Sequence, residues 1–169
     1  METTARLKTL SEASLPLALT KAERYRLLNE PTEAESICRD ILAVQPSNQA
    51  ALVMLILSLS DQIAERHKSF QDAMTQVPLL ESEYDRAYYA GILWERRAKA
   101  RLADVGPGGT HTIFDWLTKA MRLYEQAEGL REPGHDDPIL RWNTCVRYLA
   151  AHPEVRPAAE EVPQALMLE

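Results

Sequence analysis

The stretch Asn29-Glu30-Pro31-Thr32-Glu33-Ala34-Glu35 decides how this chain folds, because it separates two runs of helix-forming residues with a tight turn. Asn29 belongs to the residue types that end a helix in the left-handed conformation. Pro31 suits the first turn of the next helix, where its missing N–H would have no partner anyway. The sequence therefore predicts an antiparallel pair of helices, over residues 15–28 and 32–44.

Turns of the same kind divide the rest of the chain. Gln45-Pro46-Ser47-Asn48 precedes a third predicted helix over residues 49–60, with Ser47 or Asn48 as its N-cap. The glycine-rich segment Gly106-Pro107-Gly108-Gly109 is another strong turn signal. The remaining helices are expected within 61–78, over 83–103, around Ala120 and over 138–150.

The composition agrees with a helical protein. The chain has 169 residues, of which only 6 are glycine, and the alternating apolar runs that are typical of strands are essentially absent. Hydrophobic residues make up 46% and charged residues 26%, which indicates a folded domain with a core. We therefore predict an all-α fold of about seven helices, arranged as a solenoid of antiparallel hairpins that stack on one another.

Charge and hydropathy exclude several kinds of partner. The net charge of −6 argues against nucleic acid and against anionic membrane surfaces. The longest apolar stretch, residues 50–59, is too short to cross a bilayer. The 2 cysteines, Cys38 and Cys145, do not make a disulfide framework. The expected location is the cytoplasm.

Two parts of the chain resemble the tetratricopeptide-repeat family, and the likeness is to uncharacterised bacterial members. The family's repeat has a small and then an aromatic residue on its first helix, and Ala, a bulky residue and Ala on its second helix. The matching positions are Ala22, Tyr25, Ala34, Cys38, Ile41 and Pro46 in the first unit, and Gly91, Trp94, Ala120, Tyr124 and Ala127 in the second. This resemblance implies a right-handed solenoid with a concave face.

The resemblance also implies a binding groove along that concave face. The groove residues that it implies are Leu19, Glu23, Arg26, Val53, Leu57, Asp61, Tyr88, Ile92, Glu95 and Arg96. This lining is apolar at the centre and charged at the rim, and it lacks the Lys/Asn cluster with which family members hold a terminal carboxylate. The expected ligand is therefore a hydrophobic or amphipathic peptide or helix of an unknown protein partner.

The helix over residues 49–60 supports this hypothesis, because it is apolar almost all round and such helices are normally buried all round. A partner, a second copy of the chain or the chain's own C-terminal tail is expected to cover it. The main alternative function is accordingly a structural scaffold that self-associates, for example as a homodimer, through the same surface or through the tail.

The predicted domain is residues 15–152. It is preceded by a weakly helical segment, 1–14, and followed by a proline-rich flexible tail, 153–169, that ends in the apolar tip Leu166-Met167-Leu168. Docking of this tip into a groove is a further hypothesis. A disordered tail is the alternative.

No catalytic, cofactor-binding or metal site is predicted, and the chain is not expected to be an enzyme. The candidate metal ligands are His111, His135, Asp136, Asp137 and His152, but they lack the spacing that would place two of them on one ion. A metal-dependent enzyme therefore remains the weakest alternative. The basic run 95–101 is interpreted as a solvated helix face whose arginine stems cover apolar surface, with Arg96 as a possible contact for an acidic partner.

Overall fold

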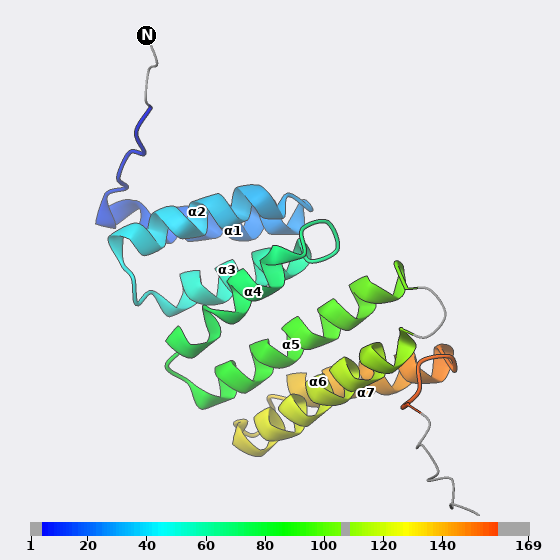
Figure 1. Ribbon diagram of the computed structural model, residues 1–169. Helices are drawn as coiled ribbons and strands as arrows, with labels where there is room; N and C mark the ends of the chain where they lie inside the picture. The colour runs from blue at the N-terminus through cyan, green and yellow to red at the C-terminus, as the bar shows by residue number, and fades with distance from the viewer. Residues whose placement is uncertain (1–4, 106–108, 159–169) are drawn as a thin grey trace, which may run out of the picture.

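The computed structural model describes residues 5–105 and 109–158, and in that part of the chain it has seven α-helices and no strand (Figure 1). The helices are α1 (Leu15–Leu27), α2 (Pro31–Val44), α3 (Gln49–Asp61), α4 (Lys68–Met74), α5 (Glu83–Leu102), α6 (Thr110–Leu130) and α7 (Asp137–Ala151). They stack in order, with α1 and α2 at one end of the molecule and α6 and α7 at the other. The all-α prediction is confirmed, and the packing is compatible with a helical solenoid.

The helix boundaries follow the turn signals in the sequence. Asn29 has a φ of 62°, so it ends α1 in the left-handed conformation, as predicted. The side chain of Asn48 accepts a hydrogen bond of 2.9 Å from the backbone N–H of Ala51, which identifies it as the N-cap of α3. Ser82 caps α5 in the same way, by accepting from the N–H of Asp85 at 3.2 Å.

The long helix α5 joins two hydrophobic clusters. Ala90 and Leu93 belong to the first cluster, which also draws side chains from α1 to α4. Ile92 and Ala98 belong to the second cluster, with side chains from α6 and α7. Each large apolar side chain that is fully buried in such a cluster contributes roughly 1.5–3 kcal/mol. Because α5 packs on both sides, it holds the two halves of the stack together.

Small residues lie where helices pack closely. Ala34 and Ala120 have no exposed surface. A Cβ atom added to Gly91 of α5 would lie 2.6 Å from Cε1 of Tyr124 in α6, well inside van der Waals contact. Helices α5 and α6 therefore pack closely only because position 91 has no side chain.

The apolar helix α3 is buried by the chain's own helices. Leu55 and Ile56 have at most 1% of their surface exposed. Val53 packs against the first hydrophobic cluster and Leu57 against the second. No external partner is needed to account for this helix, so the sequence-based argument for one is not supported.

The region 61–78 contains a helix, as predicted, and that helix is short. It is the seven-residue α4, and a 3-10 turn, Val77–Leu79, follows it. Phe70 and Ala73 face inward, with 3% and 0% of their surface exposed. The short helix α4 places the Phe70 ring against side chains of α5.

Three local features differ from the sequence-based predictions. Residues 5–11 are not helical, and a single 3-10 turn, Glu12–Ser14, precedes α1. Tyr25, which matches the family's aromatic position, is 36% exposed. Val155, within the predicted tail, is only 4% exposed and packs in the second cluster. The apolar tip 166–168 lies outside the described residues.

Candidate functional site

The ten predicted groove residues do not form one open apolar surface. Leu19 packs in a small cluster at the α1 end of the stack, and Glu23 is exposed. Val53, Leu57 and Tyr88 are partly buried against neighbouring helices. The other five residues are either buried or held in ion pairs, and they are Arg26, Asp61, Ile92, Glu95 and Arg96.

Three of those five residues form an ion-pair chain across three helices. Asp61 of α3 accepts a hydrogen bond of 2.6 Å from Nε of Arg26 in α1, and it also pairs with the guanidinium of Arg96 in α5. The three residues are spaced 35 positions apart, so they occupy equivalent places on alternate helices. The structure therefore brings these three predicted groove residues together, and Arg26 and Arg96 share the single carboxylate of Asp61. Arg96 is held in this ion pair, although the three residues together keep one positive charge.

Glu95 and Ile92 are buried, with only 1% and 2% of their surface exposed. Glu95 accepts a hydrogen bond of 2.6 Å from the hydroxyl of Tyr124 and forms ion pairs with Lys99 at 2.5 Å and with Arg141 of α7 at 3.5 Å. The prediction that they line an open groove is wrong for this structure, because α6 and α7 cover this side of α5.

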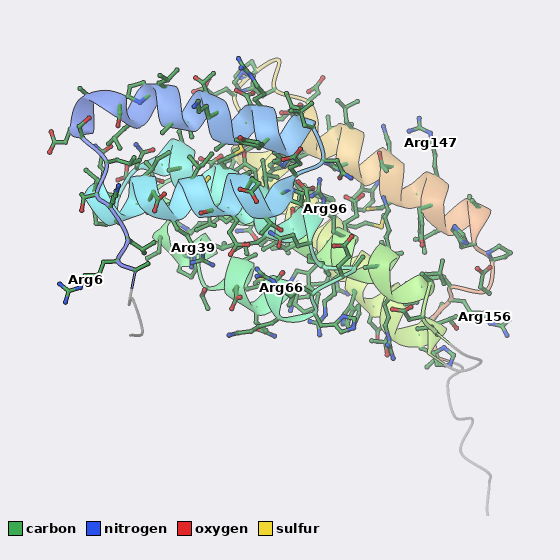
Figure 2. The ribbon with its side chains drawn as sticks, turned by 90° about the horizontal axis from the view of Figure 1, so that it is seen from above. Arg6, Arg39, Arg66, Arg96, Arg147 and Arg156 are labelled. Carbon is green, nitrogen blue, oxygen red and sulfur yellow. The ribbon has the colours of Figure 1, made fainter. Side chains whose placement is uncertain are left out.

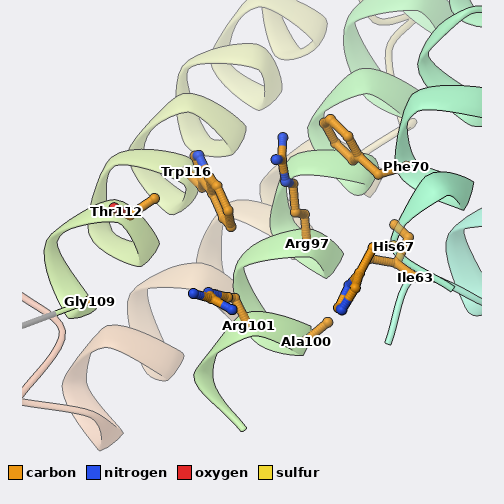
Figure 3. A pocket seen from close by; sticks show the side chains of 9 residues that line it. All are labelled: Ile63, His67, Phe70, Arg97, Ala100, Arg101, Gly109, Thr112 and Trp116. Carbon is orange, nitrogen blue, oxygen red and sulfur yellow. The ribbon is translucent and has the colours of Figure 1, made fainter. Parts of the chain in front are cut away.

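The most distinctive cavity lies on another side of α5, between α4, α5 and α6 (Figure 3). We call it the arginine cavity. Its volume is about 430 Å³. Its lining residues are Ile63, His67, Phe70, Arg97, Ala100, Arg101, Gly109, Thr112 and Trp116.

The guanidinium of Arg97 lies between two aromatic rings in this cavity (Figure 3). Its Cζ atom is 4.2 Å from the ring centre of Phe70 in α4 and 4.1 Å from that of Trp116 in α6. Cation–π attraction favours this arrangement. Burial lowers the pKa of Arg97, yet an arginine stays protonated in proteins. The two rings lie on either side of the cation.

None of the described residues that line the arginine cavity carries a carboxylate. Arg97 and Arg101 stand one helical turn apart, and the hydroxyl of Thr112 and the imidazole of His67 add further polar groups. Helix α6 begins beside the cavity after Gly109, and in the part of the chain that the structure describes it has neither a side-chain cap nor an acidic residue in its first turn, so the positive end of its dipole adds to the charge there. The cavity is thus positively charged in a chain whose net charge is −6.

A second cation extends the aromatic cluster. Trp94 of α5 packs at 4.9 Å from Phe70 and 6.2 Å from Trp116, measured between ring centres. Nζ of Lys119 lies 4.0 Å from the ring centre of Trp94. The Cζ atom of Arg97 is also 5.3 Å from the ring centre of Trp94, so three aromatic rings surround Arg97 and Lys119 contacts one of them.

This site was not predicted from the sequence. The run 95–101 was interpreted as a solvated helix face whose arginine stems cover apolar surface. The rings come from α4 and α6, which are distant in sequence. The available signal was the spacing of Arg97 and Arg101, four residues apart on one helix, together with apolar Phe70 and Trp116 on the helices that flank α5.

The candidate metal ligands are not brought together. Among residues 5–105 and 109–158, no group of three or more His, Cys, Asp or Glu residues is arranged to hold an ion. Asp136 pairs with Arg131 at 3.2 Å, and Nδ1 of His152 lies 3.0 Å from Glu154. These side chains serve local contacts around α7.

Neither cysteine has the surroundings of a nucleophile. Cys38 and Cys145 have no exposed surface. Burial, reinforced by the negative charges of Glu35 and Glu95 respectively, raises the pKa of both thiols to about 12. A thiolate is the reactive form, so these thiols are inert in the folded protein.

Comparisons with known proteins add no relative: the chain matches no family model, and no curated protein or solved structure is significantly similar to it. None of the helices in the described part of the chain has the length and apolar character needed to traverse a bilayer. The arginine cavity itself is therefore the basis for a proposed function.

Proposed function

We propose that this chain is a non-enzymatic binding module, related in architecture to tetratricopeptide repeats, which holds an acidic segment of another polypeptide in the arginine cavity. The family resemblance of Ala34, Ala120 and Gly91, and the stacked antiparallel helices, support the architecture. Helical solenoids commonly use their surfaces to bind extended partners. The ligand proposed here differs from the apolar segment expected from sequence, because the cavity is cationic.

The observation that carries the proposal is the position of Arg97. Its guanidinium is held between Phe70 and Trp116, and the lining residues within 5–105 and 109–158 include no acidic side chain. An arginine that is fixed by stacking loses little conformational freedom when it binds a carboxylate, and its N–H edge matches that group in a bidentate way. The rings of Phe70 and Trp116, which line the cavity, offer apolar contact to the residues that flank the carboxylate.

Selection from a random peptide library tests the proposal. The full chain is immobilised, and displayed twelve-residue peptides are selected on it. We expect the enriched peptides to be acidic, with at least one aromatic or large aliphatic residue. Their affinity for Arg97→Ala should fall by about tenfold or more, which corresponds to the loss of a charge-assisted bidentate contact.

Arg147→Ala is the matched control, because Arg147 is exposed on α7 and points away from the other helices (Figure 2). It removes the same charge and should leave binding unchanged. Circular dichroism establishes that both variants remain helical. Enrichment of neutral peptides, failure to enrich any peptide, or equal binding by Arg97→Ala contradicts the proposal.

Light scattering coupled to size-exclusion chromatography separates this function from the self-associating scaffold. A binding module of the proposed kind is monomeric in the absence of ligand and keeps the arginine cavity open. A constitutive dimer in which Arg97→Ala weakens association would show that the same surface serves self-assembly instead.

A further inference from the structure

We infer that the chain's own tail provides an acidic partner for Arg101: Glu160 and Glu161 pair with it, within one molecule, at the end of the arginine cavity near Gly109. The pairing does not depend on the proposed function, but its consequence, weaker binding of other acidic segments, rests on that function and describes its regulation. Residues 159–169 include Glu160, Glu161 and Glu169 and no basic residue. The cavity is positively charged, so the two are complementary in charge.

The beginning of the tail is fixed beside the cavity. Val155 is 4% exposed and packs in the second hydrophobic cluster. One residue later, the carbonyl oxygen of Arg156 lies 3.4 Å from Nδ1 of His111. His111 stands in the first turn of α6, between Gly109 and Thr112, and both of these residues line the cavity. The tail therefore leaves the described part of the chain at the end of the cavity where α6 begins.

Glu160 and Glu161 are within reach of that end. Glu160 follows Arg156 by four residues, which extend over roughly 14 Å at most. Because Arg156 is anchored, the two carboxylates stay at a high local concentration near the cavity.

Arg101 is the cation that faces this end of the cavity. Its side chain is exposed, it belongs to the lining, and its guanidinium points from α5 toward the side where Gly109 lies (Figure 3). Within residues 5–105 and 109–158, no acidic side chain forms an ion pair with Arg101, and this includes nearby Asp104. A carboxylate of the tail would supply the missing counter-charge.

The pairing leaves Arg97 for a partner. Figure 3 shows the guanidinium groups of Arg97 and Arg101 pointing to different sides, so a carboxylate at Arg101 does not occupy the place beside Arg97. The tail nevertheless opposes acidic ligands, because its negative charges reduce the positive potential of the cavity. An exposed ion pair contributes little, so we expect an effect of about two- to fivefold on affinity.

A double substitution in the full chain tests the pairing. The Arg101 Nε–Hε resonance is followed by NMR in the wild type, in the tail variant Glu160→Gln/Glu161→Gln and in the control Glu125→Gln/Glu132→Gln. The control removes two exposed carboxylates at and just beyond the other end of α6. We expect the resonance to shift in the tail variant and to stay in place in the control. Added sodium chloride should move the wild-type resonance toward its position in the tail variant, because salt screens an exposed ion pair.

The affinity for the acidic library peptides tests the regulation. It should rise by about two- to fivefold in the tail variant and remain unchanged in the control. Equal affinity of the wild type and the tail variant overturns the regulatory role.

The outcomes distinguish this inference from the proposed function. An Arg101 resonance that is identical in the wild type and the tail variant overturns the pairing, even if the library yields an acidic ligand. If the library yields none, the proposed function fails, and a shifted resonance still supports the pairing. A wild-type resonance that moves toward that of the tail variant on dilution shows that the tail reaches a second copy of the chain, and overturns the pairing within one molecule.

Discussion

The hydroxyl of Tyr124 donates a hydrogen bond of 2.6 Å to Oε2 of Glu95, and both side chains are buried, with 0% and 1% of their surface exposed. Lys99 and Arg141 balance the charge of the carboxylate from the other side. This contact links α5 to α6, and Arg141 adds α7. It explains how a charged residue can occupy the interior of the C-terminal half of the stack.

Tyr124→Phe removes this hydrogen bond and changes the volume of the core very little. A hydrogen bond to a charged group contributes about 1.5–3 kcal/mol, so the free energy of unfolding should fall by about that amount. Urea denaturation followed by circular dichroism measures the loss. Tyr25→Phe, on the half-exposed side of α1, is the control and should change stability by less than about 0.5 kcal/mol. Equal effects of the two substitutions would contradict the importance of the buried contact.

Gly91 and Gly129 allow a matched test of helix packing. A Cβ atom at position 91 would meet the Tyr124 ring at 2.6 Å, whereas a Cβ atom at position 129 would meet nothing within 4 Å. Gly91→Ala should therefore destabilise the protein by about 1–3 kcal/mol through overpacking. Gly129→Ala should stabilise it by up to about 1 kcal/mol, because alanine is the better helix former. A thermal melt of each variant checks the opposite signs.

Thiol reactivity reports the burial of the two cysteines. Because burial raises the pKa of Cys38 and Cys145 to about 12, almost no thiolate is present at pH 8, and a disulfide reagent such as Ellman's should react only as the protein unfolds. We expect both thiols to react at once in concentrated urea and very slowly without it. Rapid native reaction of either thiol would show that its helix opens locally.

The features that could be predicted from the sequence are those that depend on residues close together in the chain. Asn29 ends a helix through its own backbone conformation, and Asn48 begins one through its side chain. Ala34 and Ala120 mark close helix packing, because only a small residue is tolerated at those positions. The exposure of Tyr25 and the burial of Glu95 were not predictable in this way. They depend on which helix covers each side of α1 and α5, and periodicity alone does not determine that.

The same distinction explains the candidate site. The basic run on α5 is visible in the sequence, but its two adjacent arginines have different environments. Arg96 pairs with Asp61 of α3, which it shares with Arg26, whereas Arg97 stacks between Phe70 of α4 and Trp116 of α6. Long-range packing alone decides which arginine stays available for a ligand.

A second charged network, on the other half of the molecule, is centred on Glu35 of α2. Its carboxylate accepts hydrogen bonds from Arg39 at 2.8 Å, from Gln62 at 2.8 Å and from Arg66 at 2.9 Å. Arg39 and Arg66 lie on the same side of the molecule (Figure 2). Because Gln62 and Arg66 belong to the loop between α3 and α4, this network fixes that loop against α2.

The Glu35 network should make stability depend on acid pH. Burial raises the pKa of this carboxyl, but the hydrogen bonds from Gln62 and Arg39 and the charges of Arg66 and Arg39 outweigh that effect and lower it below its usual value of 4.5. A carboxyl whose pKa is lower in the folded state stabilises the protein above the unfolded pKa, and that contribution is lost as the pH falls through the folded value.

The free energy of unfolding of the wild type should therefore exceed that of Glu35→Gln most strongly near neutral pH, and the difference should shrink as the pH drops below 4.5. Urea denaturation at a series of pH values measures both proteins under identical conditions, so the titration of all other carboxyl groups largely cancels in the difference. A difference that stays constant from neutral to acid pH would mean that Glu35 contributes through packing alone, and that its ion pairs with Arg39 and Arg66 add no net stability.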